Sequence, residues 1–244
     1  MEFSIIVPTY QEEGCIEQCL RSIAQQKYER TEYEIIVSDA HSTDRTVEKA
    51  RQYADRIIHD DRRGIAYGRN AGALSACGDI LVFVDADATL SSDFLIQSHQ
   101  VFQNSSVVGM TGIPKPSDGG FLQRFVYRGT YWLVRIFYFF GVSLFPGICV
   151  AYRREPFKKL GGFREDFGIV EDLDLSRRIS RMGRCKINKK ARAFVSTRRL
   201  EKHLLSTVTF HIYSDIRYLF TGKTSKHYPK IEEMNSWKDL WQNH

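Results

Sequence analysis

The sequence lacks cysteine pairs at metal-ligand spacing, a dinucleotide-binding glycine motif and an uncharged segment long enough to span a membrane. Its five cysteines are an odd number, which favours a reduced, cytoplasmic protein. No Gly-x-Gly-x-x-Gly follows the first predicted strand, which argues against a dinucleotide-dependent oxidoreductase. The uncharged run 136–152 is slightly short for a membrane span, and Gly141, Pro146 and Gly147 interrupt it. The chain leads directly into the apolar segment 3–8, so we expect no signal peptide.

Length and composition indicate a single globular domain. The 244 residues are 43% hydrophobic, which is enough for one sizeable core. The formal net charge of +6, from 35 Lys and Arg against 29 Asp and Glu, suits an anionic partner. A nucleotide, a phospholipid surface and a nucleic acid all fit that description.

Apolar runs that predict strands alternate along the chain with helical patterns. The predicted strands are 3–7, 33–38, 56–59 and 80–84, and the predicted helices are 13–26, 43–53 and 68–76. This alternation is typical of βαβ units, so we expect an α/β fold with a parallel sheet. The strands 3–7, 33–38 and 80–84 end in polar residues, and their ends converge on one rim.

Two carboxylates, Asp85 and Asp87, follow the predicted buried strand 80–84. If the backbone stays extended, both side chains point the same way and face one ion. Sites with few protein oxygen ligands suit Mg²⁺ or Mn²⁺, which complete their coordination with substrate phosphates. The alternative is a strand end whose two acids are simply solvated.

Several short motifs follow one another along the chain. They are Val7-Pro8-Thr9-Tyr10-Gln11-Glu12-Glu13, Ile35-Ile36-Val37-Ser38-Asp39 with Ser42-Thr43-Asp44, Gly68-Arg69-Asn70-Ala71-Gly72, Gly78-Asp79, Asp85-Ala86-Asp87, Gly161-Gly162-Phe163 and Glu171-Asp172-Leu173-Asp174-Leu175. In order and spacing they resemble the family 2 glycosyltransferases of the GT-A fold, over roughly residues 1–185. The resemblance implies a single Rossmann-like domain with a mostly parallel central sheet flanked by helices. Gln11 in place of a common asparagine and Ala40-His41 in place of a frequent Asp-Gly leave the nucleotide open.

The resemblance also implies a site for a nucleoside-diphosphate sugar and for Mn²⁺ or Mg²⁺. The nucleotide-binding residues it implies are Pro8, Thr9, Glu12, Asp39, Arg69 and Asp85, and the metal ligands are Asp87 and Asp85. Asp39 would hydrogen-bond the base, and Arg69 would lie near the base or the diphosphate. Asp39 has an alternative as a turn or helix-cap acid, and Arg69 has one as a solvated helix residue.

The acids Glu171 and Asp172 precede a helical pattern formed by Leu175, Ile179 and Met182. At a helix start the dipole favours ionised carboxylates, so ordinary helix stabilisation is one interpretation of both acids. The resemblance implies instead that Asp172 is the general base of an inverting single displacement. Glu171 would then serve the acceptor or a phosphate. Asp174 we expect on a solvated helix face.

An aromatic and basic segment, 121–145, follows the Pro/Ser/Gly-rich stretch 114–120. Aromatic rings with interspersed arginines suit a helix lying at the headgroup boundary of a bilayer, as a platform for a lipid-linked acceptor. An ordinary core helix or a dimer face is the alternative. We expect 1–113 to be the nucleotide-sugar-binding half, 114–210 the acceptor-binding and catalytic half of the same domain, and 211–244 a C-terminal tail.

Four further residues are weaker candidates. Arg198 and Arg199 suit a phosphate of the donor or of a polyprenyl phosphate, or else a solvated helix cap. His203 and His211 are candidates for a third metal ligand.

Together these patterns predict a metal-dependent glycosyltransferase that acts on an acceptor hydroxyl or phosphate. We expect it in the cytoplasm, with peripheral contact to the inner face of a membrane. A nucleotide-sugar-binding module without catalysis is the main alternative. A nucleic-acid-binding protein is disfavoured because the acids at the strand ends would repel phosphates. The base, the sugar, the acceptor and the oligomeric state stay open.

Overall fold

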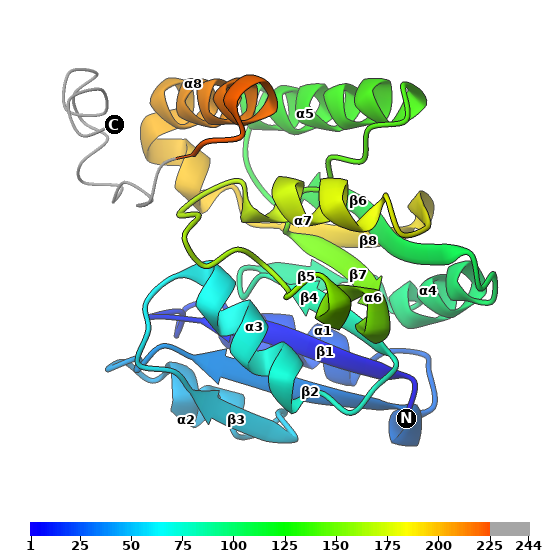
Figure 1. Ribbon diagram of the computed structural model, residues 1–244. Coiled ribbons are helices and arrows are strands. Elements are labelled where there is room, and N and C mark those ends of the chain that lie inside the picture. The colour runs from blue at the N-terminus through cyan, green and yellow to red at the C-terminus, as the bar shows by residue number, and fades with distance from the viewer. Residues whose placement is uncertain (225–244) are drawn as a thin grey trace.

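The computed structural model describes residues 1–224, and within them it describes Leu122, Thr130 and 198–207 by their backbone alone. The described strands form one eight-stranded sheet in the order β3-β2-β1-β4-β7-β6-β8-β5 (Figure 1). The strands are β1 (Phe3–Thr9), β2 (Tyr33–Asp39), β3 (Arg56–His59), β4 (Ile80–Val84), β5 (Ala88–Leu90), β6 (Val107–Pro116), β7 (Cys149–Arg153) and β8 (Arg184–Val195). The helices are α1 (Ile16–Ala24), α2 (Thr46–Ala50), α3 (Ile65–Ser75), α4 (Phe94–Phe102), α5 (Phe121–Phe139), α6 (Arg154–Lys159), α7 (Glu171–Ile179) and α8 (Arg198–Thr221), with a short 3₁₀ helix at Arg30–Glu32.

The first four strands form the parallel part of the sheet. β1 pairs in parallel with β2 and β4, and β2 pairs in parallel with β3. The predictions for 56–59 and 80–84 match β3 and β4 at both ends, because each is a short apolar run between turn signals. The register puts Thr9 opposite Asp39, so β1 and β2 end side by side. The predicted α/β fold with converging strand ends is confirmed.

The remaining strands mix directions. β7 runs antiparallel to both β4 and β6, β8 pairs in parallel with β6, and β5 runs antiparallel to β8. The predicted boundary at 113/114 falls inside β6 and that at 210/211 falls inside α8. The division into halves and a tail therefore stays a prediction about roles, not about separate folding units.

Helices α1 and α2 are shorter than the predicted spans 13–26 and 43–53. The loops that precede α1 and α2 are bonded to each other. Side-chain oxygens of one loop accept hydrogen bonds from backbone N–H groups of the other. Glu13 N donates to Asp44 Oδ2 at 3.1 Å, and Arg45 N donates to Glu13 Oε2 at 3.0 Å. Since side chains satisfy these N–H groups, the backbone there has no need of a helical turn.

Apolar side chains pack on both faces of the sheet. Phe3, Ile5 and Val7 of β1 join the core cluster that includes residues of α1, α2 and α4. Ile6 points the other way, into the cluster that includes residues of α3, α6 and α7. This alternation is that of a strand covered by helices on both sides.

Helices α5 and α8 contact each other along the edge of the molecule farthest from β2 and β3 (Figure 1). The aromatic segment is thus helical over Phe121–Phe139, as predicted. Within residues 1–224 no helix has both the length and the apolar character needed to cross a bilayer.

Candidate functional site

Three loops at the sheet edge share an uncommon backbone conformation. Among the described residues, the non-glycine residues with positive φ are Gln11 at 56°, His41 at 57° and Val170 at 59°. Gln11 and His41 follow β1 and β2, and Val170 directly precedes α7. Left-handed conformations cost about 1–3 kcal/mol for such residues and gather at functional sites. Their positions mark this rim as the candidate site.

Asp39 is fixed at the end of β2 and is 1% exposed. Its carboxylate accepts hydrogen bonds from Thr9 Oγ1 at 3.1 Å, Ser42 N at 2.9 Å and Ser42 Oγ at 2.6 Å. His59 Nδ1 lies 3.6 Å from Asp39 Oδ2. The interpretation of Asp39 as a turn acid is therefore confirmed, and its contact with a nucleotide base stays a prediction.

A cavity of about 170 Å³ lies between the start of α1 and the strands β5 and β8. Its lining includes Cys15, Asp87, Asp118 and Ser196. The Cys15 thiol donates to Glu12 Oε2 at 2.9 Å, so the predicted nucleotide-binding Glu12 adjoins the same cavity. The cavity thus brings the predicted metal ligand Asp87 near a residue of the predicted nucleotide site.

The segment Asp85-Ala86-Asp87 forms a turn between β4 and β5. Ala88 N donates to Asp85 O at 2.9 Å, and Ser196 N donates to Asp87 O at 3.2 Å. The condition of an extended backbone is not met here, because the chain turns between β4 and β5, and β5 then pairs with β8. Both carboxylates act on one buried thiol: burial raises the pKa of Cys19, and the charges of Asp87 and Asp85 raise it further.

Arg69 lies at the centre of the site and is 2% exposed. Its Nη2 donates to Asp85 Oδ1 at 2.9 Å and to Gly147 O at 3.1 Å, and its Nη1 donates to Glu171 Oε1 at 2.7 Å. The Phe163 ring lies 5.2 Å from its guanidinium carbon. The interpretation of Arg69 as a solvated helix residue is therefore wrong. This buried cation links Asp85, from the sheet edge, to Glu171 of α7.

Glu171 and Asp172 open α7, as predicted. Asp172 Oδ2 accepts from Gly147 N, and Asp172 Oδ1 accepts from Leu173 N at 2.8 Å. Burial raises the pKa of Asp172, and burial with the Asp172 charge raises the pKa of Glu171 to about 7. The favourable helix dipole is thus outweighed by desolvation, which penalises the ionised form of both acids.

Asp215 of α8 is an acid near the site that the sequence reasoning missed. Burial and then the charge of Asp172 raise the pKa of Asp215 to about 7. The available signal was composition, since Asp215 and Arg217 are the only charged residues in the segment 208–222. An acid in such an apolar helix is expected to have a charged or hydrogen-bonding partner, or a function.

Asp174 was expected on a solvated face, and that expectation is wrong: it is 3% exposed. Its carboxylate accepts from Arg178 Nε at 2.6 Å and from Tyr218 Oη at 3.0 Å. Arg164 Nη1 lies 3.8 Å from Asp174 Oδ1. Because Tyr218 belongs to α8, Asp174 joins the helix that carries Asp172 to the helix that carries Asp215.

The weaker candidates fall mostly outside the described side chains. Arg198, Arg199 and His203 have described backbones only, so the structure says nothing of their side chains. His211 is exposed on α8. Over the part of the chain with described side chains, no group of three His, Cys, Asp or Glu residues is arranged to hold a metal. Asp85 and Asp87 offer the carboxylate oxygens that Mg²⁺ and Mn²⁺ prefer, and metal binding by them stays a prediction.

The sequence profile of the family described as Glycosyl transferase family 2 matches residues 4–161. The chain belongs to this family. The match includes every motif from Pro8 to Asp87 and ends at Gly161. The expected resemblance is therefore confirmed.

Several named relatives of the family are similar to parts of this chain. Glycosyltransferase AglE of Haloferax volcanii is 35% identical over 98 residues, which are 38% of this chain and 32% of that protein. The glucosyl-dolichyl phosphate glucuronosyltransferase of the same organism is 28% identical over 180 residues, which are 69% of this chain and 58% of that protein. The chain thus spans less than two thirds of the length of these relatives.

A similar solved structure confirms the fold class. The mannosyltransferase PcManGT from Pyrobaculum calidifontis, in complex with GDP-Man and Mn²⁺, superposes with a TM-score of 0.72 at 26% identity. The superposition covers 92% of this chain and 66% of that one. The GT-A type architecture predicted from the motifs is confirmed by this match.

Proposed function

We propose that this family 2 chain transfers a sugar, with inversion, from a nucleoside-diphosphate sugar to an acceptor hydroxyl or phosphate. The observation that carries the proposal is the buried Arg69 network. It joins Asp85, of the predicted donor side, to Glu171, the neighbour of the predicted base Asp172. Donor and base residues therefore belong to one connected site.

The donor would lie along the rim formed by the ends of β1 and β2. Pro8, Thr9 and Glu12 follow or end β1, and the buried Asp39 presents a fixed carboxylate opposite Thr9. A base that carries an N–H between two carbonyls needs such an acceptor. The PcManGT structure, solved with GDP-Man, supports a nucleotide-sugar donor by analogy.

The predicted metal ligands are Asp87 and Asp85. Their hard carboxylate oxygens suit Mn²⁺ or Mg²⁺, and Mn²⁺ is present in the PcManGT complex. When bound, such an ion neutralises charge on the leaving diphosphate. Arg69 supplies a fixed positive charge beside Asp85 and contributes to the same stabilisation.

Asp172 would act as the general base. The amide groups of Gly147 and Leu173 hold its carboxylate in place, and its raised pKa makes it a better proton acceptor near neutral pH. Asp172 takes the proton of the acceptor hydroxyl while the acceptor oxygen bonds to the anomeric carbon. The bond from that carbon to the diphosphate oxygen breaks on the opposite side, which inverts the configuration.

The acceptor is proposed to be lipid-linked. The relative that matches 69% of this chain is named a glucosyl-dolichyl phosphate glucuronosyltransferase. Glu171 and the basic pair Arg198 and Arg199 are the predicted acceptor or phosphate contacts. A lipid-linked acceptor agrees with the proposed location of the protein in the cytoplasm, at the inner face of a membrane.

A transfer assay with a matched variant tests this function. Purified protein is incubated with Mn²⁺, a glucosyl-dolichyl phosphate, whose sugar carries acceptor hydroxyls, and each of UDP-Glc, UDP-GlcNAc, UDP-GlcA and GDP-Man. We expect glycolipid product from one donor, a loss of about a hundredfold or more in Asp172→Asn, and no loss in the exposed control Asp166→Asn. Donor binding without product from any acceptor would favour the non-catalytic module.

A further inference from the structure

The outer face of α5 carries large apolar side chains that are at least half exposed. Phe121 and Phe139 are 85% and 84% exposed, and Trp132 is 55% exposed. The exposed rings and aliphatic side chains at helical spacing are Phe121, Phe125, Trp132, Ile136, Phe139 and Phe140. This exposure rules out the core-helix interpretation of the segment.

The neighbouring helix α8 presents a second apolar stripe. Ile212, Ile216 and Phe220 recur every four residues and are 48%, 49% and 86% exposed. Residues spaced by four lie on one helix face. Helices α5 and α8 contact each other at the same edge of the molecule (Figure 1), and we refer to their exposed apolar side chains together as the α5/α8 face. Monomeric soluble proteins rarely expose contiguous apolar areas of this kind without a partner.

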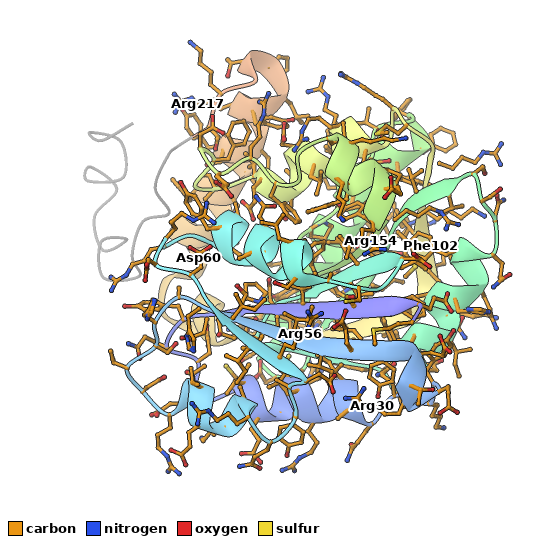
Figure 2. The ribbon with its side chains drawn as sticks, turned by 60° about the horizontal axis from the view of Figure 1, so that its bottom comes forward. Arg30, Arg56, Asp60, Phe102, Arg154 and Arg217 are labelled. Carbon is orange, nitrogen blue, oxygen red and sulfur yellow. The ribbon has the colours of Figure 1, made fainter. Side chains whose placement is uncertain are left out.

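Basic residues accompany the apolar ones. Arg124 and Arg128 are exposed on α5, and Arg135 stacks over the Trp132 ring at 4.8 Å. The segment 121–145 contains no Asp or Glu. Arg217 of α8 lies at the end of the molecule opposite Arg30 (Figure 2). The apolar rings match the acyl boundary of a bilayer surface, and the arginines beside them match its anionic phosphates.

We propose that the α5/α8 face is a docking surface for an anionic lipid bilayer, and that both helices insert their exposed apolar side chains at the headgroup boundary. A second copy of this chain is a poorer partner. In a twofold dimer the same patch meets itself, so Arg124 and Arg128 of the two copies would approach one another. A bilayer containing anionic lipid has no such repulsion.

Docking through this face would bring the catalytic helix to the membrane. Tyr218 of α8 is bonded to Asp174 of α7, and Phe210 of α8 packs against Ile169 in the loop before α7. The face and the predicted base Asp172 are therefore parts of one packed unit. In this respect the inference rests on the proposed function, because it identifies the membrane as the place where a lipid-linked acceptor meets Asp172.

Vesicle flotation of the full chain tests the proposal. We expect flotation with phosphatidylcholine vesicles that contain phosphatidylglycerol, and much less with phosphatidylcholine alone. The variants Phe139→Ser/Phe140→Ser and Ile216→Ser/Phe220→Ser should each weaken binding by about tenfold or more. Leu74→Ser, which removes a side chain that is 79% exposed on α3, should leave binding unchanged.

The outcomes separate the alternatives. No flotation of the native chain overturns the proposal, and so does unchanged binding of the α8 variant, which would leave α5 to act alone. Dimerisation lost in both variants, without flotation of the native chain, would assign the face to a second copy. An unchanged circular dichroism spectrum and urea midpoint of each variant verify that it is folded. Flotation needs no turnover, so it can succeed where the transfer assay fails, and the reverse.

Discussion

Replacing Arg69 by Met removes the only positive charge bonded to Asp85 and Glu171 within the described site. Arg69 is 2% exposed, and its ion-pair distances are 2.9 Å to Asp85 and 2.7 Å to Glu171. The Glu171 side chain is 7% exposed and that of Asp85 is 20% exposed. Water can therefore solvate the Asp85 carboxylate in part. The free-energy cost of removing Arg69 thus comes mainly from the more deeply buried Glu171.

Breaking a buried ion pair by removing one partner costs about 3–5 kcal/mol, and we expect Arg69→Met to lie in that range. The loss should grow between pH 6 and pH 8. Arg69 lowers the pKa of Glu171, so without Arg69 that pKa rises above its present value of about 7 and Glu171 stays protonated at pH 6. At pH 8 the variant must either keep Glu171 protonated or bury an unpaired charge.

Urea unfolding followed by circular dichroism measures these free energies. The double variant Arg69→Met/Glu171→Gln should recover about 1–3 kcal/mol of the loss, because the more deeply buried of the two carboxylates is then uncharged and only the partly exposed Asp85 remains without its cation. Arg62→Met is the matched control: Arg62 pairs with Asp60 at 2.8 Å but its side chain is 49% exposed, and we expect a loss below about 1 kcal/mol. An Arg69→Met loss as small as that of the control would refute the reasoning.

Three further predictions concern the same site. An added Cβ at Gly147 would lie 2.5 Å from Arg69 Nη2, so Gly147→Ala should lower the free energy of unfolding in urea by about 1–3 kcal/mol. The control Gly129→Ala should cause no such loss, because no atom lies within 4 Å of a Cβ added there. Equal losses in the two variants would contradict the prediction. Asp39→Asn should weaken nucleoside-diphosphate binding in calorimetry by about tenfold or more, and unchanged affinity would remove Asp39 from the nucleotide site. Burial raises the pKa of Glu171 from 4.5 to about 7, so between these pH values the folded state keeps a proton that the unfolded chain releases. The free energy of unfolding therefore falls as pH rises through this range. Glu171→Gln should flatten this pH dependence in urea titrations, and an unchanged pH dependence in the variant would contradict the prediction.

Local sequence patterns predicted the parts of the fold that depend on neighbouring residues. The run 80–84 specified β4 at both ends, since a short apolar run between turn residues needs no distant partner. The predicted start of α1 at residue 13 was wrong because Glu13 N bonds to Asp44 Oδ2, in the loop before α2. Helix bounds were thus reliable only where no such contact competes with the helix.

Tertiary packing decided the features of the site that the sequence did not reveal. Asp174 is buried because Tyr218, 44 residues later, donates to it. Asp215 was missed for the same reason, since only the packing of α8 beside α7 brings it near Asp172. A helical position that looks solvated in isolation becomes a buried contact when a distant helix covers it. No local pattern carries that information.

Isothermal titration of the native chain with UDP, GDP, CDP and dTDP, each with and without Mn²⁺ and repeated on Asp87→Asn, tests the central claim most directly. The account predicts that one nucleotide binds, that Mn²⁺ strengthens its binding, and that Asp87→Asn weakens the metal-dependent part by about tenfold or more. Absence of binding by every nucleotide, with or without Mn²⁺, would contradict the assignment of this rim as a nucleotide-sugar site.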